Sequence, residues 1–543
     1  MTEAGERALF DRLGIESLAY LLAADVGELE ARRENPFTHQ LNERQERVLG
    51  ELVTLDTTIQ PRRPGGDNAA EWTSFLATAS DPNPDVSLGN LARTMSGGSV
   101  PSVDTGLGGV EGLLTKMAID CYPGLLVREP DDPFGFPRSL SRALFRHPAN
   151  QAFQDLARSD DDLGRVFTEE SEHTGPTGSV LRSTGNGGTL QLWSLAETLI
   201  SSGWIAASTL SNAPTIDKFT TAVLDGLNKI RAAIDAQPVR IPARVGLAGM
   251  LLPEEIEEVD LGWGRLRRSD ERDAPYIRAA GASGQLTGTD EFGETAVINY
   301  HGDLVLEIEV PYSLRIRSLD VTQPWPESLL VSARAVEAAV ENLRLGLLLA
   351  FPDRRAVVHV SWQTQLDPLS SHRLAGWNDL TRAVGLMPMN LSSPQIGQWR
   401  DWAIRVQQHR TPSTAVAVRR MLASVAERRT MEDVLVDAVI VWENLFGAKT
   451  ETTLRVCSSL AWLLGTSADD RKARLARYKK IYAFRSAVVH GAASINQQQL
   501  QEFALESVEI SMDALRAIFE SRPELLAIPT SEERSLEIMH SGS

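Results

Sequence analysis

Cysteine, net positive charge and long apolar runs are all scarce in this 543-residue chain. Its two cysteines, Cys121 and Cys457, are far apart in sequence, and two thiols alone form neither a disulfide framework nor a zinc site. The most apolar stretch, residues 343–351, is far shorter than the roughly 20 residues that a membrane-spanning helix needs. Acids and arginines interrupt residues 1–22, so no signal peptide is predicted. These absences predict a cytoplasmic protein with no membrane contact.

The shortage of basic residues bears on nucleic-acid binding. A formal net charge of −18 argues against general coating of nucleic acid, because Lys and Arg supply most of the non-specific affinity for phosphate. Residues 471–480 are an exception, since six of these ten residues are basic. This run predicts a local RNA-binding surface made of Arg471, Lys472, Arg474, Arg477, Lys479 and Lys480.

Length predicts several domains, because a single hydrophobic core stops growing at a few hundred residues. The predicted fold class is multidomain and mainly α, with a small α/β middle module and a C-terminal antiparallel helical bundle. The expected parts are a helical N-terminal module (1–60), a mostly helical, loop-rich region of unknown fold (61–283), the α/β module (284–392), the helical bundle (393–525) and a tail (526–543).

Two sequence features in the first half of the chain give little indication of a chemical function. Residues 14–33 faintly resemble a repressor-like helix-turn-helix, but residues 1–60 are acidic, which favours a protein-contact module over a DNA-binding regulator. The glycine-rich segments 96–109 and 174–188 lack the Lys-Ser/Thr of a P-loop and the pattern of a dinucleotide fold. We expect both segments to be ordinary loops.

The middle of the chain changes to strand-like patterns. Apolar residues alternate with charged ones over residues 306–310 and 314–317, which predicts half-buried strands. A helix is predicted over residues 326–351, beginning at Pro326, and a short apolar strand over 356–362.

Beyond residue 393, hydrophobic spacing and capping residues predict five helices joined by short links. The predicted helices begin near Thr411, Thr430, Thr450, Ser467 and Asn496. Amphipathic helices with short links specify an antiparallel bundle.

The end of the fourth predicted helix holds the residues best suited to catalysis. Tyr482, Ser486 and His490 repeat every four residues and so share one face, with Arg485 beside them. Histidine can act as base or acid near neutral pH, and a guanidinium can bind phosphate oxygens. Cleavage of RNA by its own 2′-hydroxyl needs both functions and no metal. The same residues have a structural interpretation, in which Arg485 pairs with Glu443 and His490 ends the helix.

Three ordered segments extend this motif: MEDVLVDAVIVWENLFG, TETTLRVCSSLAWLLG and YKKIYAFRSAVVHG. Together they resemble the HEPN superfamily, in particular its ApeA-like branch from bacterial defence proteins, over about 110 residues. The positions that match are Asp437, Glu443, Leu445, Phe446, Thr450, Glu451, Arg455, Tyr482, Arg485, Ser486, His490 and Gly491.

The resemblance implies roles for these residues. Arg485 and His490 match the catalytic pair of the family, Ser486 its polar position after the arginine, and Glu443 an acidic position that could orient Arg485. Members commonly dimerise, which implies a homodimer or higher oligomer. The chain departs from the family pattern at Trp442 and Asn444, which puts the role of Glu443 in doubt.

The sequence therefore predicts a metal-independent endoribonuclease with no cofactor, a toxin or antiphage defence effector that cleaves RNA. Residues 1–392 would sense a trigger or hold a regulatory partner. The alternative is a non-catalytic HEPN-like dimerisation or binding module in a multidomain interaction protein.

Overall fold

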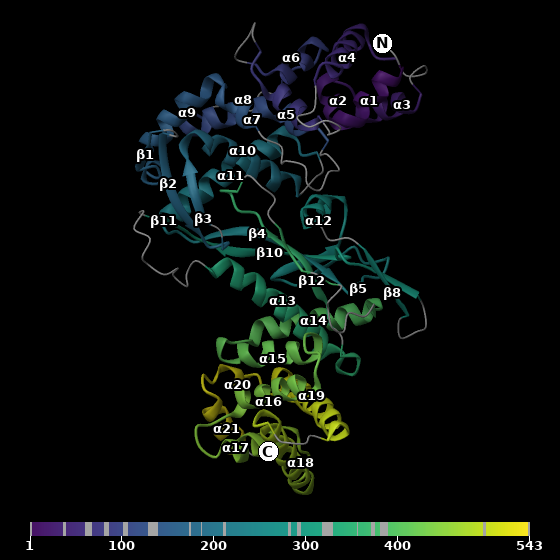
Figure 1. Ribbon diagram of the computed structural model, residues 1–543, viewed down its shortest axis with the longest axis vertical. Coiled ribbons are helices and arrows are strands. Elements are labelled where there is room, and N and C mark those ends of the chain that lie inside the picture. The colour runs from purple at the N-terminus through teal and green to yellow at the C-terminus, as the bar shows by residue number, and fades with distance from the viewer. Residues whose placement is uncertain are drawn as a thin grey trace.

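The protein is seen here as a computed structural model that is mainly helical, with mostly antiparallel sheets, and elongated (Figure 1). The N-terminal helices lie at one end of the long axis and the C-terminal bundle at the other. Within the described residues, no helix is both long enough and apolar enough to cross a membrane. The structure describes residues 3–35, 40–59, 68–80, 86–100, 107–128, 140–172, 175–185, 187–209, 213–280, 284–289, 295–317, 330–355, 357–370, 375–378, 380, 389–491 and 496–540.

The N-terminal module is helical, as predicted, but it does not end at residue 60. Trp72 and Leu76 are buried in the same core as Leu18 and Leu49, so the module extends into the next helices. Its helices are α1 (Glu3–Leu13), α2 (Ile15–Leu22), α3 (Val26–Glu34), α4 (Glu43–Asp56), α5 (Ala69–Ala77) and α6 (Leu88–Met95).

A second group of helices packs against a four-stranded sheet. The segment 174–188, expected to be an ordinary loop, contributes the hairpin of β2 and β3. Residues 101–106 of the other glycine-rich segment lie outside the described residues. The elements are α7 (Gly109–Leu125), α8 (Ser141–Phe145), α9 (Pro148–Ser159), β1 (Glu169–Ser171), β2 (Gly175–Arg182), β3 (Gly187–Gln191), α10 (Leu195–Ser208), α11 (Ile216–Ile234) and β11 (Leu314–Arg317).

A six-stranded antiparallel sheet forms the middle of the molecule, in the order β13-β12-β4-β10-β7-β6. Leu306 in β10 pairs with Val245 in β4 and with Leu266 in β7, and all three side chains are buried on one face. The sheet thus begins well before residue 284, where the α/β module was expected to start. Its strands are β4 (Val239–Ala248), β6 (Glu258–Asp260), β7 (Gly264–Arg268), β10 (Leu304–Tyr312), β12 (His359–Gln365) and β13 (Ala375–Trp377).

Shorter elements lie around this sheet. Tyr276 of α12 stacks on Trp362 of β12, with 5.6 Å between the ring centroids. These elements are β5 (Met250–Leu251), α12 (Ala274–Ala280), β8 (Gln285–Thr289), β9 (Thr295–Asn299) and β14 (Met389–Asn390).

Helix α13 (Val331–Ala350) joins the sheet to the C-terminal bundle. Leu343 and Leu347 are buried in the core of the sheet, whereas Leu345 and Leu348 are buried in the core of the bundle. The bundle is therefore not separable at residue 393, because a cut there would expose its apolar face. Helix α14 (Ser393–His409) packs beside α13. The expected start of α13, Pro326, lies outside the described residues.

The helices predicted for the bundle are present, and Thr430, Ser467 and Asn496 cap three of them as expected. The helix expected to begin at Thr450 instead has Glu451 at its N-cap, with no side-chain cap hydrogen bond. The Thr430 hydroxyl accepts a hydrogen bond from the Asp433 amide at 3.3 Å, and Ser467 accepts one from Asp470 at 3.2 Å. The helices are α15 (Ala415–Ala426), α16 (Met431–Phe446), α17 (Thr452–Leu464), α18 (Ala468–Val489), α19 (Gln497–Ser521), α20 (Glu524–Ala527) and α21 (Ser531–His540).

Residues 526–543 were expected to form a tail. In the structure this segment contains α21, which packs against α16 and α17. Arg534 of α21 is 1% exposed and donates to the carbonyls of Leu445 at 2.9 Å, Asn444 at 2.6 Å and Ile528 at 2.7 Å. Burial lowers the pKa of this guanidinium. The carbonyls at the C-terminal end of α16 carry a partial negative charge, so Arg534 fixes α21 to the bundle.

Candidate functional site

Glu443, near the C-terminal end of α16, connects that helix to α18 through both of its carboxylate oxygens. The Tyr482 hydroxyl donates a hydrogen bond to Oε1 at 2.6 Å, and Arg485 Nη2 lies 3.4 Å from Oε2. Tyr482 and Arg485 are three residues apart, so they lie side by side on α18 and meet the same carboxylate. The structure thus brings together three of the predicted site residues.

Tyr482 is the more tightly held of the two partners. Burial raises its pKa, and its hydrogen bond to Glu443 raises it further, since the protonated hydroxyl is the donor. Tyr482 therefore fixes the carboxylate that in turn faces Arg485.

Removing the Tyr482 hydroxyl should weaken the bundle. For Tyr482→Phe we expect a loss of about 1 kcal/mol in the free energy of unfolding at pH 7, measured by urea denaturation. Because folding raises the pKa of Tyr482, its contribution is fully present below about pH 10, where an unfolded tyrosine ionises, and it is lost as pH rises through the folded pKa. The difference from wild type should shrink above about pH 10. Tyr300→Phe is the control, because the Tyr300 hydroxyl has no hydrogen-bond partner among the described residues; an equal loss there would contradict this assignment.

Arg485 is only loosely held. Its side chain is 19% exposed, and its ion pair with Glu443, at 3.4 Å, is longer than an ordinary charge-assisted hydrogen bond. Its Nε is buried and has no hydrogen-bond partner among the described residues. A guanidinium has five N–H donors, so Arg485 retains donors that can bind a phosphate.

His490 lies at the C-terminal end of α18, where its amide donates to the carbonyl of Ser486 at 3.0 Å. Its imidazole is exposed and meets no hydrogen-bond partner in the described part of the chain. Five residues separate it from Arg485, which in a helix corresponds to about 7.5 Å along the axis and about 140° around it. The structure therefore groups Tyr482 with Arg485 at Glu443, while His490 is a separate, solvent-accessible group about 1.4 turns further along α18. Gly491 follows with a φ of 71°, a left-handed conformation that favours glycine.

The basic run on α18 is partly neutralised by nearby acids. Arg474 pairs with Asp470 at 3.0 Å, and Arg477 bonds to Glu506 at 2.9 Å and also pairs with Glu502. Arg471 instead lies over the ring of Trp462, 4.1 Å from its centroid. The three lysines of the run, Lys472, Lys479 and Lys480, are exposed.

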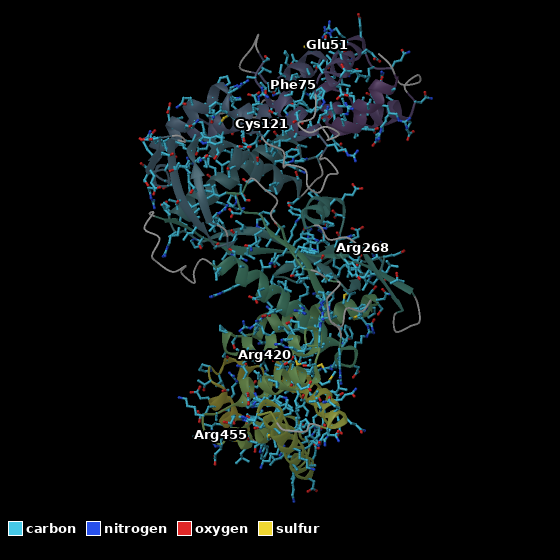
Figure 2. All side chains as sticks on the ribbon, viewed as in Figure 1. Glu51, Phe75, Cys121, Arg268, Arg420 and Arg455 are labelled. Carbon is cyan, nitrogen blue, oxygen red and sulfur yellow. The ribbon has the colours of Figure 1, made fainter. Side chains whose placement is uncertain are left out.

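Other motif positions have structural contacts. Asp437, 2% exposed, pairs with Arg420 at 2.7 Å and with Arg428 at 2.6 Å, which ties α15 to α16. Arg455 of α17 lies 3.5 Å from Glu532 of α21. Figure 2 shows Arg420 and Arg455 on different parts of the bundle. These residues position helices and do not line the Glu443 contact.

The two departures from the family pattern make contacts away from the Glu443 carboxylate, and the Trp442 ring lies 5.9 Å from the Tyr478 ring of α18. Trp442 is fully buried and donates through Nε1 to the Ser511 hydroxyl at 2.9 Å. The Asn444 side chain accepts from the Ala417 amide at 3.1 Å. Both residues pack α16 against α15 and α19, so they leave Glu443 free to face Tyr482 and Arg485.

The described residues hold no group of three or more His, Cys, Asp or Glu side chains placed to bind a metal ion. The chain matches no protein-family model, no curated protein and no solved structure.

Proposed function

We propose that the C-terminal bundle is a HEPN-type endoribonuclease, an RNA-cleaving toxin or antiphage defence effector that acts in the cytoplasm. The observation that carries the proposal is the contact of Glu443 with Tyr482 and Arg485, five residues before an exposed His490. Arg485 also has a buried Nε without a hydrogen-bond partner among the described residues, and a phosphate oxygen would satisfy this donor.

The chemistry assigned to these residues balances without a metal. His490 removes the proton of a ribose 2′-hydroxyl, whose oxygen attacks the adjacent phosphorus, and the P–O5′ bond breaks as the 5′-oxygen takes a proton from a second, protonated imidazole or from water. Arg485 stabilises the added negative charge of the phosphorane through bidentate hydrogen bonds. The products are a 2′,3′-cyclic phosphate and a 5′-hydroxyl. Glu443 and Tyr482 position the guanidinium, and Ser486 lies between Arg485 and the helix end.

We propose a homodimer as the active form. One copy places a single imidazole at the end of α18, whereas the reaction needs a base and an acid. Two copies would supply two such groups. The 392 residues that precede the bundle would sense a trigger or hold a regulatory partner, and α13 is the physical connection, because its leucines are buried in both cores.

The exposed lysines of α18 should determine how RNA binding depends on salt. Replacing Lys472, Lys479 and Lys480 by Ala should lower the slope of log affinity against log salt by about 2 for single-stranded RNA, because each phosphate contact contributes about 0.7. Arg477 should contribute less, since Glu502 and Glu506 already neutralise it. Fluorescence anisotropy over a salt series measures the slope; an unchanged slope would place the RNA elsewhere.

Cleavage of total cellular RNA by the purified full-length protein in EDTA tests the proposed function. RNA fragments that accumulate with the concentration of wild-type protein support it. Intact RNA with both the purified protein and the protein expressed in growing cells would count against it.

The rival proposal is a non-catalytic binding module, favoured by the ion pair between Arg485 and Glu443 and by His490 at a helix end. It differs in its prediction for stability, because breaking a structural buried pair costs about 3–5 kcal/mol, whereas loss of an exposed catalytic group is nearly neutral.

A further inference from the structure

Trp462, near the C-terminal end of α17, is an exposed aromatic residue beside the basic run of α18. Tryptophan carries a large apolar ring that proteins usually bury, yet Trp462 is 37% exposed. The guanidinium of Arg471, near the N-terminal end of α18, lies 4.1 Å from the centroid of this ring. Figure 1 shows α17 and α18 at the end of the molecule opposite the N-terminal helices. The hairpin of α17 and α18 therefore presents a planar aromatic and cationic pair to solvent.

The turn between the two helices holds this pair together. Arg471 Nε donates to the carbonyl of Gly465 at 3.4 Å. A Cβ atom at position 465 would lie 2.5 Å from Arg471 Cγ, so glycine permits the close approach of Arg471 to the end of α17. Among the described residues Arg471 makes no ion pair with an acid, and its charge is left for a ligand.

The hairpin also keeps positive charge that no acid neutralises. Residues 451–491 contain eight Lys or Arg and three Asp or Glu. Four of the eight cations form ion pairs, either with Asp470 or with acids of α16, α19 and α21. Within the described part of the chain, the cations of this segment without an ion pair are Arg471, Lys472, Lys479 and Lys480. The acids of the same segment without one are Glu451 and Asp469, so the unpaired charge is positive.

The exposed face of α18 connects this pair to the end of the helix. Lys472, Lys479 and His490 are all exposed. In a helix, their spacing in sequence places them within about 20° of one another around the axis, and Lys472 lies about 27 Å from His490 along it. The side chains on the same face between them include exposed Ala476 and Ala483, which are small and leave room for a bound strand.

We propose that the hairpin of α17 and α18 binds single-stranded RNA, with one unpaired base stacked on the pair of Trp462 and Arg471 and the adjoining phosphates on Lys472 and Lys479. Bases stack on aromatic rings and on guanidinium planes, but a base inside a duplex is already stacked between its neighbours. A stacked strand rises about 3.4 Å per nucleotide, so about eight nucleotides reach from Lys472 to His490. The direction of the strand toward His490 rests on the proposed ribonuclease function, whereas the binding itself does not.

Fluorescence anisotropy with a labelled single-stranded RNA of about 12 nucleotides tests this proposal. The measurement is made in EDTA on the full-length His490→Ala chain, so that the RNA stays intact. The single strand should bind more tightly than the same strand in a duplex, and its affinity should rise with length up to about eight nucleotides. Adding Trp462→Leu should weaken binding of the single strand about 5- to 100-fold. Trp462→Phe keeps an aromatic ring and should recover part of that loss.

Two controls separate stacking from charge and from folding. Trp377→Leu removes a tryptophan of β13 that is 50% exposed, and it should leave the affinity unchanged. An abasic ribose-phosphate strand of equal length carries the same charge but no base to stack. It should bind the Trp462 chain more weakly than RNA does, and this difference should shrink in Trp462→Leu. Equal affinity for the single strand and the duplex, or an unchanged affinity in Trp462→Leu, would overturn the proposal.

Sedimentation velocity distinguishes an RNA site from a contact between two copies of the chain. The oligomeric state should be the same with and without Trp462→Leu, and a change would assign Trp462 to a protein interface and overturn the proposal. RNA binding through Trp462 by a chain that never cleaves RNA would support the site and count against the ribonuclease alone. Cleavage with the same KM by wild type and Trp462→Leu would overturn the site and leave the ribonuclease.

Discussion

Replacing His490 by Ala should reduce RNA cleavage by about 10²- to 10⁴-fold, because the imidazole is the proposed proton-transfer group. Its side chain is exposed and has no hydrogen-bond partner among the described residues, so the melting temperature should stay close to that of wild type. Arg485→Ala should cost a similar factor of about 10²–10³, since it removes the group that stabilises the phosphorane. Initial rates on a fluorogenic RNA substrate measure both effects.

Two further variants separate catalysis from packing. Arg485→Lys keeps the charge but loses the paired donors, so it should recover only a small part of the rate. Lys480→Ala removes an exposed cation of the same helix and should leave the rate per bound substrate unchanged. Cleavage at the wild-type rate by a folded His490→Ala protein would rule out the assigned role of His490. A large fall in the melting temperature of Arg485→Ala, without loss of cleavage, would favour the structural interpretation.

Replacing Arg534 by Met should destabilise the C-terminal bundle by about 3 kcal/mol or more, since three backbone carbonyls lose their donor at a buried position. Methionine keeps much of the volume and removes the charge, so the loss reports on hydrogen bonds more than on a cavity. Urea denaturation followed by hydrogen exchange measures the effect, with early loss of protection expected over residues 531–540.

Lys472→Met is the control for Arg534→Met, because it removes a cation from an exposed position of α18. Its stability should stay within about 0.5 kcal/mol of wild type. If Arg534→Met left both the unfolding transition and the protection of α21 unchanged, the guanidinium would not be what fixes this helix to the bundle.

The bundle could be predicted from sequence because its signals are local. Thr430 and Ser467 are helix caps with an acid three residues on, and glycine follows α16, α17 and α18 within one or two residues of their ends. These patterns depend on neighbours in the chain, so they hold whatever the tertiary structure is.

The sheet was predicted less well, because its pairing is not local. In β4, Val239, Ile241, Ala243, Val245 and Leu247 alternate with polar or small residues, which is a strand signal. Pro242 interrupts the pattern and argues against a central strand. Yet β4 lies between β10 and β12 in the sheet. Both partner strands are distant from β4 in sequence, and no local feature of β4 identifies them.

The tail was missed although it carries a signal. Thr530 and Glu533 form the side-chain contact of a helix start, with Thr530 donating to the Glu533 carboxylate at 2.8 Å. The segment is short, and its buried residues include Arg534 and Ser535, which sequence reasoning assigns to the surface. Its docking depends on carbonyls from the end of α16.

The site was predicted in part. Arg485 and Glu443 were expected to interact, and their contact is in the structure. The shared use of Glu443 by Tyr482 was not expected, because periodicity groups Tyr482 with Ser486 and His490. The basic run predicted an RNA-binding surface of six cations, and in the structure acids on α18 and α19 pair with two of its arginines. The ion-pair partner of a long side chain depends on tertiary packing, which cannot be inferred from the sequence alone.

The chemical nature of the RNA ends distinguishes cleavage by the ribose 2′-hydroxyl from hydrolysis by water. Wild-type protein and the folded His490→Ala variant are incubated with a defined RNA in EDTA, and the products are analysed by mass spectrometry. We expect 2′,3′-cyclic phosphate and 5′-hydroxyl ends from wild type and none from the variant. Ends that carry a 3′-hydroxyl and a 5′-phosphate, or identical products from both proteins, would contradict this expectation.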